Sequence, residues 1–152
     1  MLRSILIGLV AGQRAMTPLA ALAGAARRGV LPYDNLPSRI MSNPVIAAGG
    51  VALAAAEIAG DKMKTAPDRT VFLGLLARTI TSGFAGAAMA PPKRQLAGAA
   101  IGIAAAVTSS YAGLAARKLA MRRWGQVPTG FVEDAIATAA GNAITNAGPV
   151  RS

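Results

Sequence analysis

Six charged side chains, set within or beside otherwise apolar stretches, are the residues of this chain that could do chemistry. Two are arginines and four are carboxylates: Arg14, Arg78, Glu57, Asp61, Glu133 and Asp134. An arginine at the centre of a membrane helix costs about 2.5 to 3.5 kcal/mol on insertion scales, so such a residue needs a partner or a purpose. We therefore treat these six residues as the candidate site and expect them to form one polar cluster.

Most other chemistry is excluded by composition. The chain has no Cys and no His, which removes disulfides, thiolate nucleophiles, zinc or haem ligand sets and imidazole acid/base catalysis. Glu133 and Asp134 are adjacent, so their carboxylates point to different faces of a helix and do not suit shared acid/base work. We expect no enzymatic activity, no metal and no cofactor.

The apolar residues indicate a membrane setting. Of the 152 residues 53% are hydrophobic, yet only 4% are aromatic, and a water-driven core needs large side chains. Membrane helices instead associate through small residues that let their backbones approach closely. Gly8 with Gly12 and Gly98 with Gly102 have the spacing typical of such contacts. The composition favours an all-α, polytopic membrane helix bundle.

Charged residues and prolines divide the chain into five apolar stretches, at residues 4–26, 44–60, 70–90, 95–116 and 131–148. Their lengths predict four to five transmembrane helices in a single membrane domain, residues 1–152. A signal peptide is a poorer reading of the first stretch, because Arg14 falls inside its apolar region. Pro18 is expected to kink this helix beside Arg14, or to turn it back without crossing.

An internal repeat is also predicted. Alignment of Arg14 with Arg78 places Thr17 on Thr81, and each copy is followed by a turn and another Ala- and Gly-rich stretch. We expect two similar helical hairpins, residues 4–62 and 70–118, followed by a fifth helix over residues 131–148.

The orientation of the five predicted spans follows from the basic residues outside them. These slightly favour an N-terminus inside and a C-terminus outside. Arg14 and Arg78 then lie near the midplane, and the carboxylates reach them from the cytoplasmic side. Along the last stretch a polar stripe that we expect to face the bundle interior comprises Asp134, Thr138, Asn142 and Thr145.

The net charge of +10 suits anchoring to anionic lipid headgroups. Nucleic-acid binding is not expected, because the Lys and Arg residues lie at stretch ends and stacking aromatics are nearly absent. We predict a location in the bacterial inner (cytoplasmic) membrane, with either a homo-oligomer or a membrane-protein partner.

Three segments, residues 12–19, 56–62 and 132–137, resemble in order the signature stretches of a family of small uncharacterised bacterial multi-pass membrane proteins, domain of unknown function 4126. The most specific element is Glu57 followed by Asp61 and Lys62. The family pattern has a proline soon after that pair, whereas here Pro67 comes later. The resemblance implies a multi-pass membrane protein and assigns no catalytic residue.

Two functions stay open from the sequence. The first is a small transport or permeation module, in which Arg14 and Arg78 bind an anion or an anionic lipid headgroup and the carboxylates neutralise or gate them. The second is a non-catalytic accessory or scaffold subunit that packs against another membrane protein, with both arginines purely structural. A lipid-modifying enzyme is a distant third, since no nucleophile with its base is present.

Overall fold

The computed structural model describes residues 1–60 and 72–147. These residues form an all-α bundle, as predicted, with seven helices and no strand among them. The helices are α1 (Leu2–Gln13), α2 (Thr17–Arg27), α3 (Leu36–Met41), α4 (Pro44–Gly60), α5 (Phe72–Ala88), α6 (Gln95–Trp124) and α7 (Gln126–Asn146).

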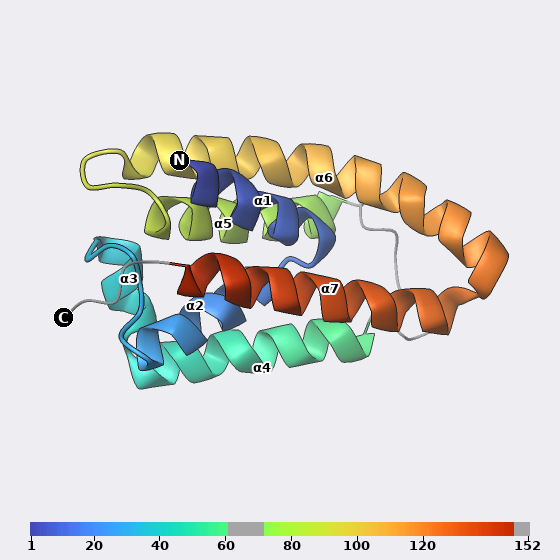
Figure 1. Ribbon diagram of the computed structural model, residues 1–152, viewed down its shortest axis with the longest axis horizontal. Helices are drawn as coiled ribbons and strands as arrows, with labels where there is room; N and C mark the ends of the chain where they lie inside the picture. Colours follow the sequence, from blue (N-terminus) through green and yellow to red (C-terminus); the bar gives the residue numbers. More distant parts are fainter. Residues whose placement is uncertain (61–71, 148–152) are drawn as a thin grey trace.

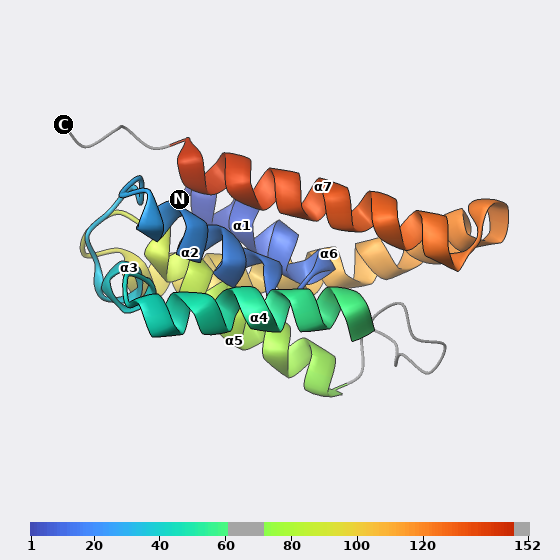
Figure 2. The ribbon, with the colours of Figure 1, turned by 90° about the horizontal axis from the view of Figure 1, so that it is seen from below.

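The first apolar stretch is two helices and not one. α1 ends at Gln13, Arg14 is extended (φ −139°, ψ 110°), and α2 starts at Thr17. α2 then runs back toward the end of the bundle where α1 began (Figures 1 and 2). Pro18 lies in the first turn of α2, where its missing N–H costs no helical hydrogen bond. The predicted proline kink is therefore wrong, because Pro18 helps to begin a helix and the reversal precedes it, whereas the alternative of a first stretch that turns back is confirmed.

This reversal changes where the chain ends lie. Helices α4, α5, α6 and α7 run alternately along the long axis, and the start of α1 lies at the same end of the bundle as the last turn of α7 (Figures 1 and 2). Five antiparallel stretches would place these two points at opposite ends. The prediction that the first helix begins and the last helix ends at opposite ends is therefore wrong, because the first stretch returns to its own side.

Close backbone contacts between small residues hold α1, α5 and α6 together. A Cβ atom added at Gly8 would come within 3.0 Å of the carbonyl oxygen of Gly102, and one added at Gly98 would lie 2.6 Å from the carbonyl oxygen of Gly86. Neither glycine has room for a larger side chain. The predicted small-residue contacts are thus confirmed, and they lie within this chain.

The segment between the first two predicted apolar stretches, residues 27–43, contains the short helix α3. Asn35 precedes it, accepts a hydrogen bond from the backbone N–H of Ser38 (3.0 Å) and donates to the carbonyls of Ala87 and Ala88 (3.1 Å each). The same side chain thus starts α3 and joins it to the end of α5. α6 continues past residue 116 to Trp124, where Gly125 ends it with a φ of +84°.

Candidate functional site

Four of the predicted site residues lie at one level of the bundle, around the break between α1 and α2. At 1.5 Å per residue, Arg14 is about 18 Å along the chain from the start of α1, and Glu57 is about 20 Å from the start of α4. Arg78 lies about 15 Å, and Asp134 about 18 Å, from the ends of α5 and α7 at that same end of the bundle. Asp61 lies outside the described residues. We call the residues that surround the break the helix-break cluster: Gln13, Arg14, Glu57, Arg78, Ser109, Ser110 and Asp134.

Arg14 and Asp134 form a buried ion pair at the centre of this cluster. Atom Nη2 of Arg14 contacts Oδ1 of Asp134, and the two side chains are 2% and 10% exposed. Hydrogen bonds and ion pairs between charged groups are strong when solvent is excluded, but losing one partner leaves an uncompensated buried charge. The pair therefore fixes α7 against the break.

Glu57 bonds the start of α2. Its two carboxylate oxygens accept hydrogen bonds from the backbone N–H groups of Ala15 and Met16, each at 2.8 Å. Both residues lie in the break just before Thr17, where their N–H groups have no helical acceptor, and a negative charge beside the start of a helix is favourable. We expected Glu57 to neutralise an arginine, but its carboxylate lies on these backbone groups instead.

Arg78 bonds the end of α1, on the other side of the break. Its Nε donates to the carbonyl oxygen of Gly12 (3.1 Å) and its Nη1 donates to that of Gly74 (3.0 Å), while the side chain is buried. The hydroxyl of Ser110 donates to the same Gly12 carbonyl at 3.1 Å. The last carbonyls of a helix favour cations. The break therefore has a cation, Arg78, at the C-terminal end of α1 and an anion, Glu57, at the N-terminal end of α2.

Sequence reasoning missed Ser109 and Ser110. Gln13 donates through Nε2 to the carbonyl oxygen of Ser109 (2.9 Å) and to its hydroxyl oxygen (2.7 Å), and that hydroxyl donates to the carbonyl of Leu9 (2.8 Å). A pair of serines inside the uncharged stretch 95–116 was the available signal. The partners of these serines are groups at the end of α1, and they are in reach only because α1 ends beside α6.

The two arginines that define the predicted repeat have different local structures. Arg14 lies in the break itself, whereas Arg78 lies inside the continuous helix α5. The first copy is therefore interrupted where the second is helical. The two residues are related by contact with the same break, and the repeat stays a prediction from sequence.

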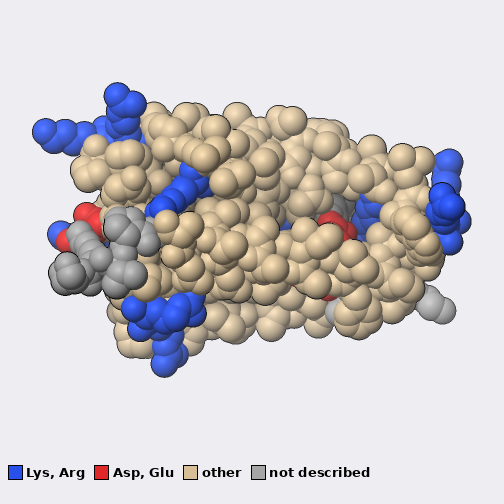
Figure 3. Space-filling model, in the orientation of Figure 1, with Lys and Arg blue, Asp and Glu red and all other residues tan. Residues whose placement is uncertain are grey.

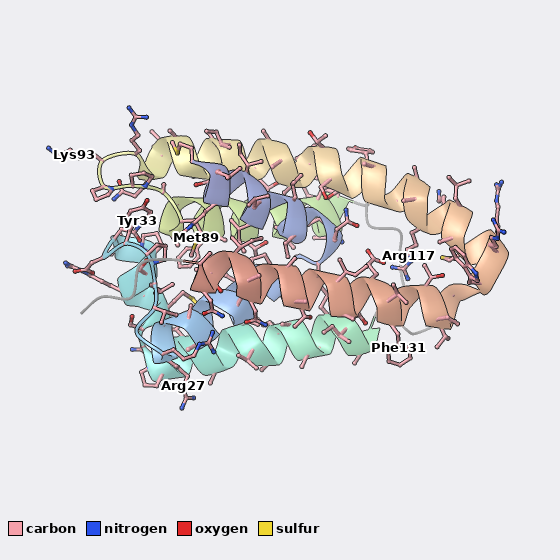
Figure 4. The ribbon with its side chains drawn as sticks, viewed as in Figure 1. Arg27, Tyr33, Met89, Lys93, Arg117 and Phe131 are labelled. Carbon is pink, nitrogen blue, oxygen red and sulfur yellow. The ribbon has the colours of Figure 1, made fainter. Side chains whose placement is uncertain are left out.

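Glu133 lies next to Asp134 but binds a different arginine. Its Oε2 lies 3.6 Å from Nη1 of Arg117, and the side chains are 16% and 11% exposed. Arg117 lies between α6 and α7, on the side of the cluster nearer the turn that joins them (Figure 4). The two adjacent carboxylates thus form an outer and an inner ion pair, in keeping with their different directions on the helix.

The predicted polar stripe of α7 is only partly at the interior. Asp134 and Thr145 are buried, but Thr138 is exposed and Asn142 is half-buried. The amide of Asn142 donates to the carbonyl of Thr138 (3.1 Å). Because this amide is hydrogen-bonded within its own helix, it needs no partner in the bundle interior. The small residues Ala137 and Gly141 lie on the buried face of α7 instead.

Within residues 1–60 and 72–147, no three acidic side chains lie close enough together to hold a metal ion. No protein-family model, curated protein or solved structure matches the chain. Membership of the family that its three segments resemble stays a prediction.

Proposed function

We propose that the chain is a multi-pass protein of the bacterial inner membrane. Helix α6 is long and apolar enough to cross a membrane, and only 22% of its most apolar window is buried in the bundle. A core helix of a water-soluble protein would be mostly buried. The other apolar helices of the described part, Leu2–Gln13, Pro44–Gly60 and Phe72–Ala88, are shorter, and a thinned bilayer would accommodate the last two.

The surface of the bundle supports this setting. Large apolar side chains face outward on the long helices, including Val45 (78% exposed), Phe72 (77%) and Leu96 (86%). In Figure 3 the Lys and Arg side chains gather mainly at the two ends of the long axis, with a broad surface of other residues between them. Exposed apolar surface bounded by basic ends is the pattern expected of a protein surrounded by lipid.

We propose further that the protein is a small transport or permeation module for an anion or an anionic lipid headgroup. The observation that carries this proposal is the non-helical backbone of residues 14–16, enclosed at mid-depth by charged side chains from α4, α5 and α7. Inside a membrane, broken backbone is tolerated only where protein or water satisfies its polar groups. Discontinuous helices form the substrate and ion sites of many transporters.

In this proposal Arg14 is the residue that binds the anion. Asp134 occupies its guanidinium in the structure, and an incoming anion would replace that carboxylate. Glu57 and Arg78 keep the two helix ends in place while the exchange occurs. Asp134 thus neutralises Arg14 whenever no anion is bound, because an uncompensated charge in a low-dielectric site is costly.

The test is anion efflux from proteoliposomes. We expect Arg14→Gln and Arg78→Gln to abolish flux. Because Arg14→Gln leaves Asp134 buried without its partner, the decisive variant is the double substitution Arg14→Gln with Asp134→Asn, which removes both charges and keeps amide groups able to hydrogen-bond. Arg94→Gln, at the exposed end of the bundle, is the matched control and should keep full flux. A correctly folded double variant with wild-type flux would contradict the proposal.

The exposed face of α4 favours a second candidate, the accessory or scaffold subunit. Only Ala47, Gly50 and Ala54 of this helix are buried, so most of its apolar surface is open to another membrane protein. Gly8 and Gly98 are already used inside the bundle and therefore cannot report on such a partner. Native mass spectrometry of the protein from its own host in mild detergent separates the candidates: a stoichiometric foreign subunit favours the accessory role, and a bare homo-oligomer favours transport.

A further inference from the structure

A small cavity lies far from the helix-break cluster, where α2 ends and α3 packs beside it. Its volume is about 120 Å³, and its lining includes Gly29, Tyr33, Asp34, Ser38 and Arg39. Figure 4 shows Tyr33 and Arg27 at this same end of the molecule. The space is large enough for a small polar group and is partly open to the outside.

Ser38 lines this cavity with a buried hydroxyl that has no hydrogen-bond partner among the described residues. The residue is only 3% exposed. A serine in a longer helix would commonly donate to the carbonyl four residues earlier, but that residue, Asp34, precedes α3. Burying a hydroxyl without a partner is unfavourable. An acceptor from outside the chain would therefore stabilise the Ser38 hydroxyl.

Arg39 supplies a positive charge at the rim. Its Nε and Nη2 donate to the two carboxylate oxygens of Asp34, at 2.9 and 3.2 Å, and the arginine side chain is 70% exposed. The hydrogen bond and the charge of Asp34 raise the pKa of Arg39, which keeps the guanidinium charged. Two of the five guanidinium N–H groups of Arg39 donate to Asp34. The other three can donate to a ligand.

We infer that this cavity binds a phosphate group, with the hydroxyl of Ser38 as the inner donor and the guanidinium of Arg39 as the outer donor. A tetrahedral phosphate has oxygens on several sides and can accept from both at once, whereas the two oxygens of a carboxylate lie on one side. Arginine is well suited to phosphate because its N–H groups are fixed in a planar fork. Asp34 is a positioning residue that holds this fork over the cavity.

The phosphate can come from a lipid headgroup or from solution. Arg27 and Lys93 lie at this end of the bundle (Figure 4), which is where lipid phosphates are found if the protein spans a membrane. Leu36, 71% exposed on α3, would then contact acyl chains. The inference does not depend on transport through the helix-break cluster.

Calorimetric titration of the detergent-purified protein tests this site with two probes, inorganic phosphate and dihexanoyl phosphatidylglycerol below its micelle concentration. We expect saturable binding that weakens about tenfold in Ser38→Ala and at least as much in Arg39→Gln. Arg94→Gln, a basic residue at the same end and outside the cavity lining, is the matched control and should bind as the wild type does.

Binding of both probes in competition supports a phosphate site open to either source, and binding of the lipid alone assigns it to a headgroup. Absence of binding by both probes would overturn the inference. So would an equal loss in Arg94→Gln and Arg39→Gln, because that result indicates diffuse attraction to a basic surface. Arg39 is exposed, so its variant is expected to fold even if Ser38→Ala is less stable.

Discussion

The guanidinium of Arg14, in the break between α1 and α2, is held by the carboxylate of Asp134 in α7. Both side chains are at least nine-tenths buried. The break between the first two helices therefore has the positive charge of Arg14 at its centre. The carboxylate of Asp134, 120 residues later in the sequence, neutralises that charge.

Removal of one member of the pair should destabilise the fold more than removal of both. We expect Arg14→Gln or Asp134→Asn to lower the free energy of unfolding by about 3 to 5 kcal/mol, since each leaves a buried charge without its partner. The double variant should recover most of this loss. Unfolding in mixed detergent micelles measures the cycle, and additive single losses would show that the two residues do not interact.

Glu57 should control the backbone at the start of α2. Glu57→Ala leaves the N–H groups of Ala15 and Met16 without acceptors, at a cost of about 1 to 3 kcal/mol, and we expect faster amide hydrogen exchange at these two residues. Glu57→Gln should have a smaller effect because its amide oxygen still accepts. Glu133→Ala is the control, since that carboxylate does not contact this backbone; unchanged exchange in Glu57→Ala would refute the role.

A matched pair of glycines tests the contact between α1 and α6. Gly8→Ala places a Cβ against the carbonyl oxygen of Gly102 and should destabilise the bundle by about 1 to 3 kcal/mol through overpacking. Gly49→Ala meets nothing within 4 Å and should stabilise α4 by up to about 1 kcal/mol, because alanine is the better helix former. Thermal unfolding in one detergent compares them, and equal shifts would argue against the close approach.

The reversal after α1 predicts a specific labelling pattern in membranes. The chain has no Cys, so single cysteines can be introduced at Leu2, Lys93 and Arg122 and labelled with an impermeant maleimide in intact vesicles. We expect positions 2 and 93 to be labelled from one side and position 122 from the other. Labelling of positions 2 and 122 from the same side would show instead that α1 and α2 cross together.

The sequence predicted the helical class and most helices because apolar stretches and their charged or proline boundaries are local signals. The start of α4 at Pro44 is an example, since a proline there needs no N–H partner. Glycine spacing likewise predicted close helix contacts, which Gly8 and Gly98 make. These features depend on residues near one another in the chain.

Local reasoning could not decide between a kink and a reversal of the first stretch near Arg14. Residues 4–26 have the length of one span, and the reversal is stable only because Glu57, Arg78 and Ser110 bond the backbone on its two sides. All three lie far away in the sequence. The partners of Glu57 were mispredicted for the same reason: a search for charge pairs considers side chains, whereas this carboxylate binds backbone N–H groups that exist only at a broken helix.

This break also dictates an order of assembly. Its backbone is synthesised before the groups that bond it, which belong to α4, α5 and α6. Until those helices are present, the N–H groups of Ala15 and Met16 and the carbonyl of Gly12 have only water as a partner, and burial would leave them unsatisfied. Burial of the N-terminal hairpin must therefore wait for α4, α5 and α6, although the hairpin is translated before them.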